Sequence, residues 1–279
     1  MLPAHVVAIV LLAAALHAGW NVLVRSGRDR RQETALMLLG GTFWAIVLLP
    51  FLPGLPTAAW PYLLISSVLN GVFFILIAEA YSRGGIALAY PVMRGVAPML
   101  TLVTAWLVLG EALPAAGWLG VGAICGGVVL LARGRGDPEE GRALRFALTN
   151  AVVISAYTLN DAIGVRIAQE PLSYTLWMFP LSAVPTWLWL RRRTSLHWPA
   201  PREALRGIGG AGASIAAYSL VLWAITQAPV APVAALRESS ILIGVVLARV
   251  LLGEQPGRRG WGGAVAIAVG AAILRLAPG

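Results

Sequence analysis

The sequence predicts an all-α membrane protein of ten transmembrane helices, arranged as two five-helix repeats of inverted topology. Composition, apolar segments and an internal repeat support this. Of the 279 residues, 58% are hydrophobic and only 12% are charged, whereas a soluble domain usually carries about 25% charged residues. So little polar surface cannot cover a water-soluble fold, and no stretch is left over for a separate soluble domain.

The apolar segments are long enough for helices that cross a bilayer. A spanning helix needs roughly 20 predominantly apolar residues. Backbone polar groups in lipid must be hydrogen-bonded within the protein, and these segments do not alternate in polarity as strands of a membrane barrel would. The expected spans are 3–24, 34–52, 59–81, 86–109, 115–132, 144–165, 173–190, 207–226, 230–252 and 259–276.

The two halves of the chain repeat each other at one fixed offset. A shift of 143 positions superposes charged, tryptophan and glycine residues: Arg94 on Arg237, Leu109-Gly110-Glu111 on Leu252-Gly253-Glu254, Gly117-Trp118 on Gly260-Trp261, Gly120 on Gly263 and Gly127 on Gly270. We therefore assign residues 1–132 to one repeat, 133–143 to a polar linker and 144–279 to the second repeat. Because five is odd, the second repeat enters the membrane in the opposite direction, an architecture common among transporters.

The arginines are distributed unevenly between the two sets of loops. Sixteen lie in segments 25–33, 82–85, 133–145, 191–206 and 253–259, and two lie in the opposite loops and chain ends. The positive-inside rule places the first set in the cytoplasm and both termini outside. The net charge of +9 thus reflects topology, and nucleic acid is not an expected partner.

Two recurring motifs and one motif near the start of the chain carry a family resemblance. Leu-Gly-Glu occurs at 109–111 and 252–254, each time before a Gly-Trp pair and a glycine-rich final helix, and the chain opens with Leu16-His17-Ala18-Gly19-Trp20-Asn21. Over its whole length the chain resembles the ten-helix EamA branch of the drug/metabolite transporter superfamily. The resemblance implies a multi-pass transporter of the bacterial inner membrane. It also implies an alternative orientation, because both termini of such proteins usually lie in the cytoplasm.

Arg94 and Arg237 are the leading candidates for contact with a substrate. Charged groups inside a bilayer are costly unless paired or hydrated, and these two are symmetry mates within apolar segments. Two guanidinium groups meeting between the repeats can grip a carboxylate or phosphonate, and we expect both to face one central cavity. The alternative is internal bracing, in which Arg94 pairs with Glu79 and Arg237 pairs with Glu238 or Asp161.

Asp161 and Glu79 are the candidates for proton coupling, and Glu238 is a further ion-pair candidate. A carboxylate withdrawn from water takes up a proton more readily, whereas a neighbouring arginine favours its charged form. Protons are therefore a possible coupling ion.

Four other polar side chains are candidates for the lining of a substrate site. A shift of 140 places His17 on Tyr157 and Asn21 on Asp161, so the first helix of each repeat carries polar positions one turn apart. Tyr157 and Tyr218 lie in the middle of their predicted helices. The alternative for His17 is a satisfied packing position.

Two places suggest special helix geometry. Pro91 and Pro98 bracket Arg94, which predicts a kinked or broken helix there. Glu111 and Glu254 lie at helix ends, where each can cap the helix that follows.

The sequence favours a transporter over an enzyme. It contains no phosphate-binding loop, zinc-ligand spacing or nucleophile elbow, and the single cysteine, Cys125, excludes a thiolate metal site. We expect no cofactor, no metal and no ATP-driven chemistry. The expected function is secondary export or exchange of a small polar, anionic or zwitterionic metabolite by alternating access, by a monomer or homodimer in the lipid bilayer. The alternative is an intramembrane accessory or lipid-handling protein without solute flux.

Overall fold

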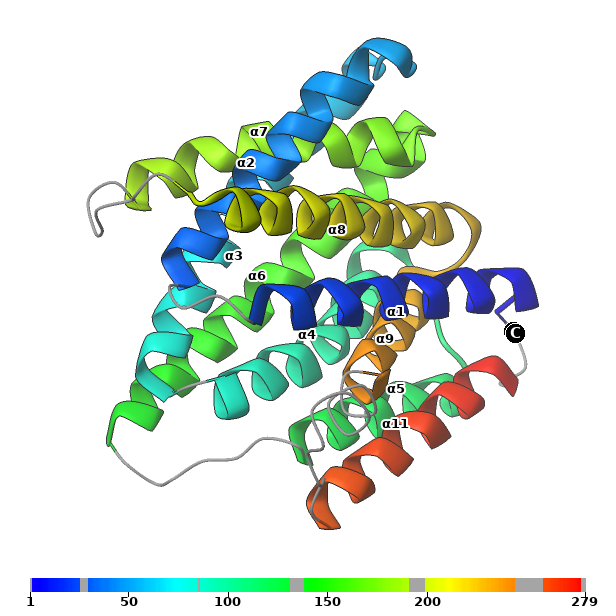
Figure 1. Cartoon of the computed structure of the whole chain (residues 1–279). Helices are drawn as coiled ribbons and strands as arrows, with labels where there is room; N and C mark the ends of the chain where they lie inside the picture. Colours follow the sequence, from blue (N-terminus) through cyan, green and yellow to red (C-terminus); the bar gives the residue numbers. More distant parts are fainter. Residues whose placement is uncertain are drawn as a thin grey trace.

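The computed structural model describes residues 2–25, 30–84, 86–130, 138–190, 199–243 and 258–276, and every regular element among them is helical (Figure 1). Two short 3-10 turns, η1 (Leu49–Phe51) and η2 (Thr57–Ala59), connect α2 to α3. The helices are α1 (Ala4–Arg25), α2 (Arg30–Leu48), α3 (Trp60–Gly84), α4 (Ile86–Leu109), α5 (Ala115–Leu130), α6 (Pro138–Ala168), α7 (Pro171–Leu190), α8 (Pro201–Gln227), α9 (Val230–Arg237) and α11 (Arg258–Leu276).

The helix starts follow from local chemistry. Proline occupies the first position of α6, α7 and α8, where its missing N–H costs nothing. In α6, Glu139 and Glu140 follow in the first turn and favour the positive end of the helix dipole. This helix therefore begins inside segment 133–143, which its polarity had assigned to the linker. In α8, the Glu203 carboxylate accepts a hydrogen bond from the Ala200 backbone N–H at 3.0 Å.

The contacts between helices have two-fold symmetry. The equivalence pairs α1 with α6, α2 with α7, α3 with α8, α4 with α9 and α5 with α11. When each helix is replaced by its equivalent, four of the observed contacts become other observed contacts: α3·α6 matches α1·α8, α3·α7 matches α2·α8, α4·α6 matches α1·α9, and α4·α5 matches α9·α11. In addition, α2·α7, α4·α9 and α5·α11 join equivalent helices directly. The two-repeat architecture expected from the sequence is therefore confirmed.

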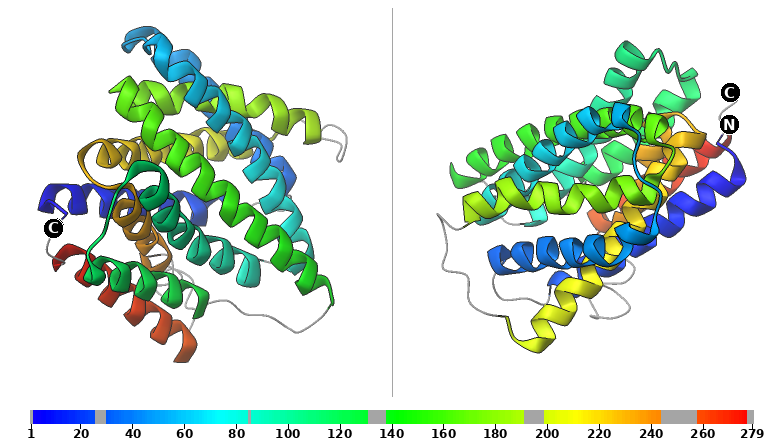
Figure 2. Two further views of the ribbon diagram at one scale, coloured as in Figure 1. Left: turned by 180° about the vertical axis from the view of Figure 1, so that it is seen from behind. Right: turned by 90° about the horizontal axis from the view of Figure 1, so that it is seen from above.

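The chain begins and ends on the same face of the bundle. The start of α1 and the end of α11 lie close together in both views of Figure 2. Successive helices cross the bundle in alternate directions, so the α4–α5, α6–α7 and α8–α9 connections lie on this face too. We call it the terminal face.

The α5·α11 contact shows the symmetry at atomic detail. A Cβ built at Gly127 would lie 2.8 Å from the Gly263 carbonyl oxygen, and one built at Gly270 would lie 2.6 Å from the Gly120 carbonyl oxygen. The repeat equates Gly120 with Gly263 and Gly127 with Gly270, so the two close contacts are symmetry mates. Glycine at these positions lets the two helix backbones touch, which explains the glycine matches found in the sequence.

The outside of the bundle is apolar. Large hydrophobic side chains on α2, α4, α5, α8 and α11 are exposed, among them Ile46, Leu107, Leu119, Leu205 and Val265. Such a surface is unfavourable in water and suits a lipid environment.

Four described helices are long and apolar enough to cross a membrane by length and composition alone, and four more apolar helices are shorter over the part of the chain that the structure describes. The long spans are Thr57–Ile77, Pro91–Leu109, Pro138–Ala168 and Pro201–Gln227; the shorter ones are Ala4–Gly19, Ala35–Phe51, Ala115–Leu130 and Trp261–Leu274.

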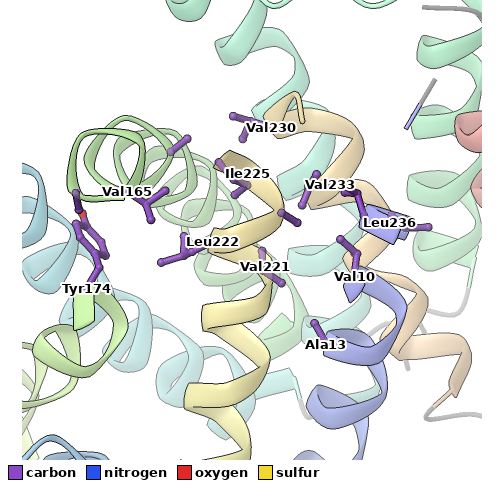
Figure 3. Packing of buried hydrophobic residues seen from close by; sticks show 14 of the residues in the cluster. Val10, Ala13, Val165, Tyr174, Val221, Leu222, Ile225, Val230, Val233 and Leu236 are labelled. Atoms are coloured by element: carbon purple, nitrogen blue, oxygen red, sulfur yellow. The ribbon is translucent and has the colours of Figure 1, made fainter. Parts of the chain in front are cut away.

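The largest apolar core joins α1, α6, α7, α8 and α9. In Figure 3, Leu222 and Ile225 of α8 lie between Val165 of α6 and Val233 of α9. This packing holds α9, the shortest helix described, in the interior of the protein.

Candidate functional site

Two buried arginines share one buried glutamate at the centre of the bundle. Arg94 Nε lies 2.7 Å from Glu238 Oε2, and Arg237 Nε lies 3.8 Å from Glu238 Oε1. The three side chains are only 8%, 7% and 1% exposed. Charges withdrawn from water to this extent require partners, and Glu238 supplies one to both arginines.

The helix that contains Arg237 is interrupted at Glu238, where the chain makes a tight turn. α9 ends at Arg237, Glu238 adopts φ −68° and ψ −10°, and helical structure resumes at Ser239. The Glu238 N–H donates to Ala235 O and the Ile241 N–H donates to Glu238 O, both at 3.0 Å and both spanning three residues. This tighter turn divides the segment predicted as one helix over 230–252.

The interruption is thus in the second repeat, whereas the sequence had predicted it near Arg94 in the first. α4 is helical from Ile86 to Leu109 with Pro91 and Pro98 inside it. In a bundle, neighbouring helices can compensate for the N–H groups that proline removes. Of the two alternatives predicted near Arg94, a broken helix is therefore wrong, and a kinked helix stays a prediction.

Asp161 of α6 is the second buried carboxylate. It is fully buried and accepts hydrogen bonds from Tyr174 Oη at 3.1 Å and Tyr218 Oη at 2.5 Å. Ser66 of α3 is a further side-chain hydrogen-bond partner of Asp161. The carboxylate therefore connects α3, α6, α7 and α8.

His17 and Tyr157 complete the site. The charges of Arg94 and Arg237 act on the His17 imidazole, and those of both arginines, Asp161 and Glu238 act on the buried Tyr157 hydroxyl. We define the central polar cluster by its members: His17, Arg94, Tyr157, Asp161, Tyr218, Arg237 and Glu238.

The central polar cluster contains seven of the nine residues singled out in the sequence. Of the other two, Asn21 has a side chain outside the described part of the structure. Glu79 forms an ion pair with Arg83 one turn further along α3, and Arg83 also lies 4.8 Å from the centre of the Phe146 ring. The internal-bracing alternative had paired Arg94 with Glu79. In the structure the described ion pair of Arg94 is with Glu238 instead.

Sequence reasoning missed two residues at Asp161. They are Tyr174, near the start of α7, and Ser66, a small residue in the apolar segment of α3. Asn160, the residue before Asp161 on α6, donates from Nδ2 to Ser66 Oγ at 2.7 Å, so the polar contacts around Asp161 include its neighbour in the chain. A serine and a tyrosine four helices apart carry no local signal that they meet.

Glu111 has a different partner from the one expected. Its Oε2 accepts a hydrogen bond from the Val230 N–H at 2.7 Å, so it caps α9 of the second repeat rather than α5, the helix that follows it. Its equivalent, Glu254, lies outside the described residues.

The cluster is electrically balanced when its two arginines and two carboxylates are all ionised. Arg94 and Arg237 contribute two positive charges, and Asp161 and Glu238 contribute two negative charges. A balanced group of charges is far less costly in a low-dielectric interior than an excess of either sign.

Comparison with known proteins identifies the family. The pattern of the EamA-like transporter family matches twice, over residues 5–133 and residues 142–276. The chain belongs to this family. Each match covers one structural repeat, as the resemblance in the Leu-Gly-Glu motifs implied. As an EamA-like protein, the chain is a multi-pass membrane protein of a transporter family, whose members are not typically enzymes.

Searches of other proteins add support for the fold alone. No curated protein sequence matches the chain. A solved structure described as "Crystal structure of protein" is similar, with a TM-score of 0.79, 20% sequence identity and coverage of 98% of each chain. At this identity the likeness shows only that the two proteins share one fold. It carries no information about the substrate.

Proposed function

We propose that this EamA-like protein is a secondary transporter that exports or exchanges a small polar, anionic or zwitterionic metabolite by alternating access. The observation that carries the proposal is the environment of Arg237. Its side chain is 7% exposed, and its one ion pair among the described residues is the 3.8 Å approach to Glu238. Arg237 Nε is buried without a hydrogen-bond acceptor in that part of the chain.

A buried donor without an acceptor costs about 1–3 kcal/mol, and more when it is charged. A carboxylate or phosphonate oxygen on the substrate would remove this cost. The guanidinium fork suits such groups because it can donate two parallel hydrogen bonds. Arg237 is therefore the proposed substrate-binding arginine.

Arg94 has a different proposed role. Its shorter, 2.7 Å approach to Glu238 makes it the anchor for that carboxylate. Glu238 is then paired closely with Arg94 and only loosely with Arg237. A substrate anion would compete with Glu238 for Arg237 only.

The balance of charges favours a zwitterion within the proposed class. An anion added to a neutral cluster leaves one uncompensated negative charge, whereas a dipolar molecule adds none. Arg237 acts electrostatically on Asp161, and these two groups of opposite charge are the proposed partners for the two ends of such a molecule.

Asp161 is the proposed proton-binding residue if transport is coupled to protons. It contacts hydroxyl groups rather than an arginine, whereas Glu238 is held by Arg94 and Glu79 pairs with Arg83. A carboxylate without a cationic partner at contact distance exchanges its proton more readily.

Alternating access would use the symmetry of the fold. In inverted-repeat transporters the substrate site lies between the repeats, and discontinuous helices line it. Here Arg237 and the turn at Glu238 end a short helix that packs against α4 and α1 of the other repeat.

The test is flux into proteoliposomes that contain the purified protein. A panel of amino acids, sugars and phosphonates is supplied with and without a pH gradient, and Arg237→Lys is compared with the parent. We expect Arg237→Lys to reduce uptake of the transported compound about tenfold or more, because lysine keeps the charge but loses the fork.

Arg142→Lys is the matched control. Arg142 is 69% exposed and pairs with Glu139 at the start of α6, so the same substitution there should leave flux unchanged. Undiminished flux in Arg237→Lys would contradict the proposed binding mode. Absence of flux for every compound would favour an accessory or lipid-handling protein.

A further inference from the structure

A charged network joins the two repeats on the terminal face. Arg166, near the end of α6, donates from Nη2 to Glu111 Oε1 at 2.7 Å and to Ala228 O at 3.2 Å. Its Nε donates to Ile225 O at 3.1 Å. Glu111 follows α4 in the first repeat, and the described partners of its carboxylate, Arg166 and the Val230 N–H, belong to the second.

Gly110 explains how Glu111 reaches this position. Gly110 follows the end of α4 and has φ +67°, in the left-handed region that glycine adopts without strain. The chain reverses there and directs Glu111 toward α6 and α9 instead of continuing the helix. In the first Leu-Gly-Glu motif, the glycine therefore makes the turn and the glutamate makes the contact with the other repeat.

Glu111 is connected to Arg237 through α9. One carboxylate oxygen of Glu111 accepts from the Val230 N–H at the first residue of this helix, where a negative charge is favourable. Arg237 is the last residue of the same helix, about 11 Å further on at 1.5 Å per residue. Every residue of α9 is buried, and in Figure 3 Val230 lies near Ile225 of α8.

We propose that Glu111, Arg166 and the start of α9 form the latch of a gate on the terminal face, with Glu111 acting as a positioning residue for Arg237. Opening this face separates Glu111 from Arg166 and releases the start of α9. The displacement of α9 then moves Arg237 and the adjacent Glu238 relative to α4 of the other repeat. The inference rests on the proposed alternating-access function.

The exposure of the latch suits a contact that opens and closes. The side chains of Arg166 and Glu111 are 33% and 14% exposed, so water can replace their mutual contact. The Arg94–Glu238 pair is almost fully buried, and breaking it would leave two charges without hydration. The latch is therefore the more easily opened connection between the repeats.

The test measures access of water to α9 without any substrate. Cys125, the only cysteine, is replaced by alanine, and Ala234→Cys is introduced as a reporter. Ala234 is 2% exposed and lies three residues before Arg237, on the same side of α9. The rate at which a membrane-impermeant maleimide labels this thiol is measured in intact cells and in inside-out vesicles.

We expect Glu111→Gln to raise the labelling rate about two- to fivefold, and only from the terminal face, because a partly exposed ion pair is lost. The glutamine oxygen can still accept from the Val230 N–H, so the helix cap is kept. Arg166→Gln removes the same ion pair and should have the same effect. It replaces Glu111→Gln in the test if that variant does not insert into the membrane.

Glu139→Gln is the matched control, because it removes the exposed Arg142–Glu139 pair at the opposite end of α6 and should not alter labelling. Unchanged rates in the latch variants, or equal increases from both faces, would overturn the proposal. Flux measured on the same variants separates the latch proposal from the transport proposal. Unchanged labelling in a protein that shows flux rejects only the latch. Faster labelling in a protein that shows no flux rejects only the transport function.

Discussion

Replacement of Gly127 by alanine should destabilise the protein, although alanine is the better helix former. The added Cβ would lie 2.8 Å from the Gly263 carbonyl oxygen, 2.9 Å from Ala266 Cβ and 3.0 Å from Ile267 Cγ1. One neighbour is backbone and another is a Cβ atom, so relief requires α5 and α11 to move apart. The symmetry-related contact between Gly120 and Gly270 would then loosen as well.

The expected magnitude follows from opposing contributions. Alanine in place of a helical glycine stabilises by about 1 kcal/mol, whereas overpacking a close contact costs about 1–3 kcal/mol. The loosened second contact adds to the cost, so the net loss for Gly127→Ala should be about 1–2 kcal/mol. At Gly126 no atom lies within 4 Å of the added Cβ, so Gly126→Ala should be neutral or stabilising by up to about 1 kcal/mol.

The assay compares the two variants after heating in the same detergent, with the monodisperse fraction measured by size-exclusion chromatography. A difference of about 1–3 kcal/mol corresponds to an apparent Tm about 2–12 °C lower for Gly127→Ala than for Gly126→Ala. A Tm for Gly127→Ala equal to or above that of its neighbour would refute the close packing of α5 against α11.

Three further predictions concern the charges. Glu238→Gln should lower the free energy of unfolding by about 3–5 kcal/mol, because it removes the carboxylate with which both buried arginines form their described ion pairs. Glu139→Gln should cost at most about 1 kcal/mol, and equal losses in denaturation would contradict the buried pair. Asp161→Asn should abolish accumulation driven by a pH gradient in proteoliposomes while exchange without a gradient continues; surviving gradient-driven accumulation would exclude Asp161 as the proton-binding residue. A thiol introduced by Ser195→Cys should resist impermeant reagents in intact cells if the arginine count sets the orientation, whereas ready labelling would show that both termini are cytoplasmic.

The sequence was sufficient to predict the class of fold and most members of the central polar cluster. Helix positions followed from runs of apolar residues, and the two repeats followed from matches at a single offset. Arg94, Asp161 and Arg237 stood out because a charge inside an apolar segment is costly. All of these signals lie within one segment or at a constant spacing, so they can be read without knowing which helices touch.

Only the tertiary structure decided which of these groups meet. Glu238 pairs with Arg94, whereas the sequence had suggested Glu79 as the partner of that arginine, and Glu111 caps α9 rather than the helix that follows it. The helix is interrupted at Glu238, which no proline or glycine marks, and not at Arg94, which two prolines bracket. The physical reason is that apolar patterning is set by the surroundings of each segment, whereas an ion pair, a cap or a helix break depends on the groups that packing brings from other helices.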